Sequence, residues 1–180
     1  MKKHLILMIF LISCGSQSPT NPETLQGNDK CKKAIDLFLP QAANGDCNAE
    51  HKVGYMYFTG TCVAQNNNKA LDYFYKAANQ GHPKAQIILG NLFYQNKNDP
   101  TISSCPDCQL QKDLSEALKW YTLATRETRR QTGKTTDESF LRRVIGDIQK
   151  EIPEKKNREA KNKIANFKYT PSKCNFKIQP

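Results

Sequence analysis

The amino-acid sequence predicts an all-α fold, namely an α-solenoid of antiparallel helix pairs that ends in a C-terminal capping helix. The main reason is an internal repeat. Residues 33–38 (KAIDLF) match residues 69–74 (KALDYF), and residues 116–121 (EALKWY) follow the same pattern. The first two segments lie 36 residues apart, and three further pairs share this offset: Gly45 and Gly81, Ala49 and Ala85, Gly54 and Gly90. A repeat of this length is typical of helical solenoids.

Small and aromatic residues in each repeat fall on one side of an expected helix. Within residues 69–80 they recur at the spacing i, i+3, i+4, i+7 and i+8, which indicates one buried helical face. The residues on that face are Ala70, Tyr73, Phe74, Ala77 and Ala78. Gly81 would end this helix, and a second helix is expected from about Pro83 to Tyr94. The small residues let neighbouring helices approach closely, while the aromatic rings fill the space between them.

These units resemble the Sel-one-like repeat, a bacterial relative of the tetratricopeptide repeat. The first unit matches through Ala49, Val53, Gly54, Tyr57, Gly60, Val63, Lys69, Ala70, Tyr73, Phe74, Ala77, Ala78 and Gly81. The second matches through Ala85, Leu89, Gly90 and Phe93, then Ala117, Trp120, Tyr121 and Ala124. Cys62 replaces the second loop glycine, and eleven inserted residues lengthen the step from Ala70 to Ala117. The resemblance implies stacked helix pairs over residues 30–128, with a role in binding or scaffolding.

The first helix of each pair would then line a concave face of the solenoid. Positions on these helices that the core pattern leaves free are the expected protein-binding residues: His51, Tyr55 and Phe58, with Ile87, Asn91 and Tyr94 at the 36-residue offset. Tyrosine is a frequent anchor in protein interfaces. For Phe58 and Ile87, packing between repeats is an equally good interpretation.

The N-terminus has the features of an export signal. Two lysines precede an apolar run over residues 5–12, which is too short to span a bilayer but suits a signal peptide over residues 1–13. The stretch LISCG at residues 11–15 resembles the lipobox of bacterial lipoproteins, which implies lipidation of Cys14 and anchoring in a membrane. Ser16 rather than Asp at the second following position implies the periplasmic side of the outer membrane. The alternative is an ordinary secreted protein in which Cys14 is incidental.

Residues 14–29 are polar and read as a flexible tether, and residues 129–180 as a basic capping helix and tail. Residues 14–125 hold ten Lys/Arg and ten Asp/Glu, whereas residues 126–180 hold fifteen and seven, a net charge of +8. Behind an export signal this basic region is not expected to meet nucleic acid. Its available acidic partners are lipid head groups, lipopolysaccharide or an acidic protein.

Three features are expected within the C-terminal region. Residues 137–152 form an amphipathic capping helix with Thr136 or Asp137 as N-cap and with Phe140, Leu141, Val144, Ile145, Ile148 and Ile152 on its apolar face. Residues 154–163 are almost wholly charged and read as a solvated helix or linker. Apolar residues beyond Phe167 recur near period two, which suggests an extended tail that docks back onto the domain.

Six cysteines remain once Cys14 is set aside, and an even number in an exported chain indicates disulfides. Antiparallel pairing of the first two helices places Cys31 and Cys62 at the same end, which favours that bridge. Cys47 lies at the opposite end, so it would need Cys174 from the returning tail. Cys105 and Cys108 form a C-x-x-C pair in the insertion, for which a local disulfide is favoured over a redox pair or half of a zinc site.

No nucleophile elbow, phosphate-binding loop or zinc-binding helix motif is present, so no enzyme activity, cofactor or metal is expected. Of the two histidines after the signal, His82 is expected to cap a helix at the surface. The predicted function is a periplasmic protein-binding module. Its sharper form is an immunity protein that neutralises an acidic effector toxin. The alternative is an envelope adaptor whose basic region contacts anionic lipid or lipopolysaccharide.

Overall fold

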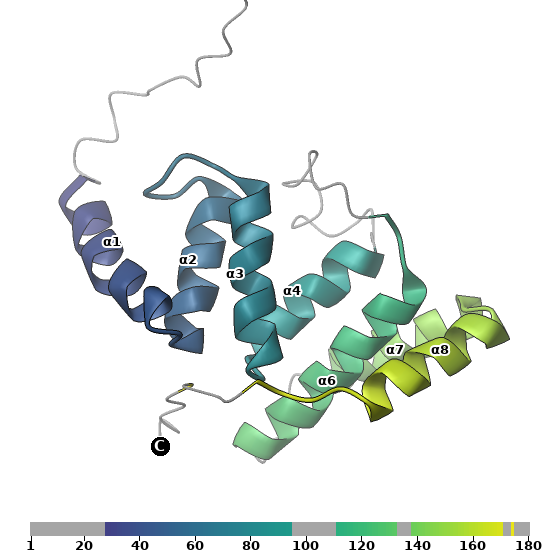
Figure 1. The fold of residues 1–180 in the computed structure, drawn as a ribbon. Helices are drawn as coiled ribbons and strands as arrows, with labels where there is room; N and C mark the ends of the chain where they lie inside the picture. The colour runs from purple at the N-terminus through teal and green to yellow at the C-terminus, as the bar shows by residue number, and fades with distance from the viewer. Residues whose placement is uncertain (1–27, 95–110, 133–137, 171–173, 175–180) are drawn as a thin grey trace, which may run out of the picture.

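The computed structural model describes residues 28–94, 111–132, 138–170 and 174 (Figure 1). The described elements are all helices: α1 (Asn28–Ala43), α2 (Cys47–Thr59), α3 (Asn67–Asn79), α4 (Pro83–Tyr94), α6 (Leu114–Thr132), α7 (Glu138–Glu151) and α8 (Glu154–Ala165). The predicted all-α solenoid is therefore confirmed. Helices α2 and α3 form one antiparallel pair, α4 and α6 the next, with α1 packed on α2 and α3 packed on α4.

Each pair is held by an aromatic ring that lies against a glycine of the partner helix. A Cβ atom added at Gly54 on α2 would stand 2.9 Å from two ring carbons of Phe74 on α3. A Cβ atom added at Gly90 on α4 would stand 2.9 Å from two ring carbons of Tyr121 on α6. Both rings are buried. The two repeats therefore use the same close approach, which the shared glycine register in the sequence indicates.

Polar caps begin the helices of the first pair. The side chain of Asp46 accepts a hydrogen bond from the Ala49 amide at 2.8 Å, and that of Asn66 accepts one from the Lys69 amide at 2.9 Å. These bonds satisfy backbone donors that have no partner within the first turn of a helix. The caps fix where α2 and α3 start and hence the register in which their apolar faces meet.

Cys62 occupies a backbone conformation that normally favours glycine. Its φ angle is 68°, in the left-handed region, at the position where the repeat pattern has its second loop glycine. For a residue with a side chain this conformation costs roughly 1–2 kcal/mol. Cys62 is bonded to Cys31, with 4.8 Å between the two α-carbons. Cys62 therefore lacks the backbone freedom that glycine would have at this position, but its disulfide links α1 covalently to the α2–α3 loop.

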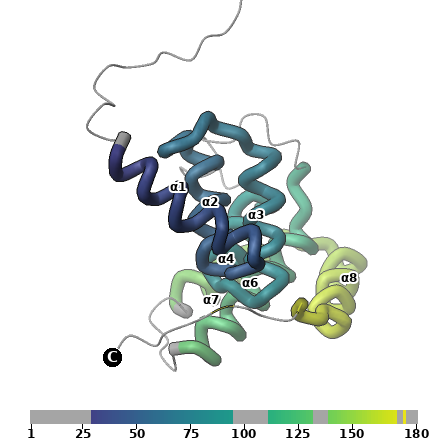
Figure 2. Tube along the Cα trace, turned by 60° about the vertical axis from the view of Figure 1, so that its left-hand side comes forward, coloured from purple at the N-terminus to yellow at the C-terminus, as the bar shows by residue number. Residues whose placement is uncertain are grey.

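Helices α7 and α8 both pack on α6, where they lie on different sides of it (Figure 2). The apolar face of α7 is buried at Leu141, Val144 and Ile148, and Ile152 directly after the helix is buried too, as expected for a capping helix. Phe140 was predicted to be buried on that face, and this prediction is wrong, because its side chain is 42% exposed. The expected N-cap residues Thr136 and Asp137 lie outside the described residues. Helices α7 and α8 do not form a third pair, because they lie on different sides of α6.

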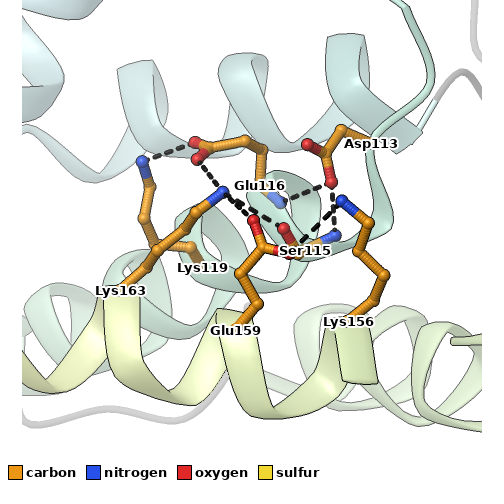
Figure 3. A network of polar contacts seen from close by, with 7 residues as sticks. All are labelled: Asp113, Ser115, Glu116, Lys119, Lys156, Glu159 and Lys163. Carbon is orange, nitrogen blue, oxygen red and sulfur yellow. Dashed lines mark hydrogen bonds and ion pairs between the residues drawn. The ribbon is translucent and has the colours of Figure 1, made fainter. Parts of the chain in front are cut away.

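Residues 154–163 form a helix that is largely exposed, in line with the expected solvated helix, but one of its faces docks on α6, which was not expected. Ala160 is fully buried, and Lys163 reaches Glu116 at 2.9 Å and the Ser115 hydroxyl at 3.2 Å (Figure 3). Burial alone would raise the pKa of Glu116, but hydrogen bonds from Lys119 and Lys163 bring it below its ordinary value. The inner face of α8 is therefore fixed on α6 by the ion pair between Lys163 and Glu116, in which both groups keep their charge.

The chain after α8 returns along α6 to the first helix pair. The Phe167 ring packs edge-on against Trp120 with 5.8 Å between centroids, and the Thr170 amide donates to the Asn79 carbonyl at 2.9 Å. Cys174 is then bonded to Cys47 on α2. The tail thereby joins the end of the described chain to its first repeat.

Alanine at the two kinds of glycine should have opposite effects on stability. Gly54→Ala is expected to lower the free energy of unfolding by about 1–2 kcal/mol, because the new methyl group displaces the Phe74 ring. Gly146→Ala on α7 meets no atom within 4 Å, so it should raise stability by up to about 1 kcal/mol through helix propensity. Urea unfolding measures both values. Equal stability of the two variants would contradict the close-approach argument.

Candidate functional site: a protein-binding surface

The expected binding residues lie on α2 and α4, the first helices of the two pairs. Tyr55 is 51% exposed, and His51, Ile87 and Tyr94 are partly buried. The side-chain nitrogen of Lys112 lies 5.6 Å above the Tyr94 ring, which orients that ring at the end of α4. Tyr55 is thus the most accessible aromatic anchor of the set.

Asn91 is a correction to the expected binding set, because it is buried, and for Phe58 the structure shows the packing alternative. Phe58 is 3% exposed and packs edge-on against Phe74 across the α2–α3 interface. Asn91 is 8% exposed, and its side-chain oxygen accepts a hydrogen bond from the Tyr121 hydroxyl at 2.6 Å. Both side chains hold a helix pair together and have little surface to offer a partner.

The two histidines stack on each other between α2 and the α3–α4 turn. Their ring centroids are 4.4 Å apart and their planes differ by 17°. His82 Nδ1 accepts a hydrogen bond from the Ala85 amide at 3.3 Å, so His82 caps α4 as expected. It does so from a buried position, which corrects the expected surface location. Burial, helped by Lys84, lowers the pKa of His51 to about 4, and burial with His51 beside it lowers that of His82 to about 3.

A buried carboxyl group lies next to this pair on α2. Gln80 donates one hydrogen bond to Glu50 at 2.8 Å and another to the Gly45 carbonyl at 3.0 Å. Burial raises the pKa of Glu50 to about 7, although Lys76 and the bond from Gln80 oppose the shift. The pKa of Glu50 therefore lies near neutral pH, and Gln80 ties both Glu50 and the α1–α2 turn to the end of α3.

The cysteines of the described chain form two bridges, Cys31 to Cys62 and Cys47 to Cys174. These are the pairs that the helix-pair argument names. Cys14, Cys105 and Cys108 lie outside the described residues, so their predicted lipidation and local disulfide stay predictions. Within the described ranges no group of three or more His, Cys, Asp or Glu side chains is placed to hold a metal ion. In the same ranges, no helix has the length and apolar character needed to cross a bilayer.

A groove between α6 and α7 is a feature that sequence reasoning missed. Its volume is about 590 Å³, and it is lined by Thr122, Thr125, Arg126, Arg129, Arg130, Ile145 and Gln149. The available signal was a set of arginines at positions 126, 129 and 130, which share one side of a helix. In the sequence these arginines appear only as part of a general basic region, because the opening depends on where α7 packs on α6.

Comparison with known proteins agrees with this architecture. Two segments match the Sel1 repeat. They are residues 47–82 and 107–127, which include the first helix pair and the start of α6. Sel1 repeats are protein-interaction modules, so this match supports a binding role at the level of the module.

Two individual proteins are similar over part of their length. The ERAD-associated E3 ubiquitin-protein ligase component HRD3A of Arabidopsis thaliana is 35% identical over 54 residues, which are 29% of this chain and 8% of that protein. A protective antigen of uropathogenic Escherichia coli strains, described as displaying an SLR fold, matches with a TM-score of 0.61 and 23% identity. That match covers 80% of this chain and 27% of the antigen, and it shows the fold.

The stability of the chain should depend on Glu50 in a pH-dependent way. The folded-state pKa of about 7 lies above the ordinary 4.5, so the stabilising contribution is complete below pH 4.5 and is lost as the pH rises through 7. Glu50→Gln should therefore raise the free energy of unfolding by up to about 3 kcal/mol at pH 8 and change it little at pH 4.5. The exposed Asp36→Asn makes the same charge change and serves as the control.

The His51–His82 pair contributes a pH dependence of stability with the opposite sign. Its pKa values lie below the ordinary 6.5, so this contribution is complete above pH 6.5 and is lost as the pH falls towards 4 and 3. Thermal melts of the Glu50→Gln variant across this range separate the two effects. A pH-independent gain from Glu50→Gln would contradict the burial of an ionisable carboxyl group.

Proposed function

We propose that this chain is a non-enzymatic protein-binding lipoprotein, anchored through Cys14 on the periplasmic side of the outer membrane. Its partner is an effector toxin with an acidic surface, which the chain neutralises by direct binding as an immunity protein. The observation that carries the binding role is the stack of helix pairs with Tyr55 exposed on the face of the first helices. A solenoid offers such a face to a partner along its whole length.

Two further features support the exported location and the acidic partner. Two disulfides join described parts of the chain, and disulfides persist in oxidising compartments such as the periplasm. The fifteen basic residues after position 125, against seven acidic ones, would attract an acidic protein and speed encounter. The expected lipobox at residues 11–15 supplies the anchor.

Lipidation can be tested on the full chain expressed in a Gram-negative host. Labelled palmitate should be incorporated into the wild type, and the protein should leave the membrane fraction only with detergent. Cys14→Ser should abolish the label and the membrane association together. Label that persists in Cys14→Ser, or a wild-type chain that is free in the periplasm, would remove the anchor from the proposal.

The immunity role can be tested with the effector encoded next to this gene. Co-expression should protect cells from that effector, and the purified full chain should bind it. Tyr55→Ala should weaken binding about tenfold, since a central aromatic anchor in an interface contributes more than 1 kcal/mol. Leu37→Ala on α1 removes another exposed apolar side chain (52% exposed) and is the matched control. Neither protection nor binding would leave the immunity role without support.

A second candidate is an envelope adaptor that rests on anionic lipid. The outward face of α8 favours it, because Lys155, Arg158 and Lys161 are exposed there. Salt-sensitive binding to vesicles of phosphatidylglycerol and phosphatidylcholine, weakened by Arg158→Gln, would favour this candidate over the immunity role.

A further inference from the structure

The groove between α6 and α7 is formed by the C-terminal half of α6 and by the capping helix α7. Helix α7 packs on one side of α6 and α8 on another, and the two share little surface with each other (Figure 2). Residues 122–130 of α6 line one side of the opening as a strip. That strip, together with Ile145 and Gln149 of α7, forms the groove. The opening therefore involves the capping helix α7, and its lining residues lie on other helices than Tyr55.

The groove combines positive charge with an apolar lining. Three of its seven lining residues are arginines and none is acidic, while Ile145 and two threonines supply methyl groups. Arg130 is held in place, since its Nε donates to the carboxylate of the buried Glu127 at 2.8 Å. Arg126 is exposed one helical turn earlier. The backbones of Arg126 and Arg130 therefore lie about 6 Å apart along the axis of α6.

We propose that the α6–α7 groove binds an acidic amphipathic helix of a protein partner. Two carboxylates one turn apart on that helix would meet Arg126 and Arg130, and an apolar side chain of the same face would contact Ile145. The planar guanidinium group of arginine matches a carboxylate with two parallel hydrogen bonds, which a lysine cannot do. This inference rests on the proposed binding of a protein and adds a second surface and the chemistry of its ligand.

The shape of the site favours a peptide over a membrane. A helix face can enter a concave opening of about 590 Å³ and contact the apolar Ile145 in its lining. On the inner face of α8, Lys156 and Lys163 are engaged by Glu159 at 3.2 and 3.1 Å. The groove arginines and the α8 face are thus separate basic surfaces, and single substitutions can distinguish them.

The test uses the full chain and a synthetic amphipathic peptide of about 15 residues that carries Glu pairs at i and i+4 beside leucines. A control peptide has Gln in place of each Glu. Fluorescence anisotropy should show binding of the Glu peptide only, with an affinity that falls as salt rises. Arg126→Gln should weaken binding about fivefold, and Arg158→Gln on α8 should leave it unchanged.

Gln149 offers a matched pair of variants, because it is exposed at the groove and either charge can replace it without disturbing the core. Gln149→Glu should weaken binding of the Glu peptide, and Gln149→Lys should strengthen it, each by roughly threefold. Equal binding of the two peptides, no binding of the Glu peptide, or no difference between the two Gln149 variants would each overturn the proposal. So would vesicle binding that depends on Arg126 in the absence of peptide binding.

The same variants separate this proposal from the proposed function. If the effector binds wild type and Gln149→Glu equally well, and the Glu peptide does not bind, the groove proposal fails while the immunity role stands. If no effector binds but the Glu peptide does so with the expected dependence on Arg126 and Gln149, the groove proposal stands and the immunity role loses its support.

Discussion

The structure depends on one contact that is made twice, in which an aromatic ring occupies the space that a side chain at a glycine would take. Phe74 lies against Gly54 and Tyr121 lies against Gly90, in both cases across a helix pair. Because no side chain separates the two backbones, alanines such as Ala70 and Ala117 can close the rest of each interface. The spacing within each pair then sets where the next helix can pack, and with it the curvature of the stack.

The repeat fold could be predicted from the sequence because this contact leaves a local record. The glycines recur 36 residues apart, and their aromatic partners Phe74 and Tyr121 keep the same place in the helix pattern, although the insertion lengthens their step to 47 residues. The docking of α8 left no such record. It depends on one small residue, Ala160, and on an ion pair of Lys163 with Glu116 and a hydrogen bond from Lys163 to the Ser115 hydroxyl, both nearly fifty positions earlier. A charged segment with little apolar surface resembles a solvated one until its partner is known.

The candidate site could be predicted less well, because equivalent positions of the two repeats differ in environment. Tyr55 and Asn91 share the 36-residue register, yet one is exposed and the other buried. The aromatic partner in the first pair is a phenylalanine, whereas in the second it is Tyr121, whose hydroxyl bonds to Asn91. The period identified the helix face, but only the partner side chain determined whether a residue stays accessible. The groove formed by Arg126, Arg129 and Arg130 likewise could not be predicted without the packing of α7 on α6.

The returning tail has a consequence for how this protein can evolve. Most solenoids lengthen or shorten by gaining or losing whole repeats, since each repeat touches only its neighbours. Here Cys174 is bonded to Cys47, 127 residues earlier, and Thr170 bonds to Asn79. An additional helix pair between α4 and α6 would move these points apart and leave the tail too short to reach. These two tail contacts make the described solenoid a closed unit with a fixed number of repeats. Sequence changes are then tolerated mainly in loops and on surfaces.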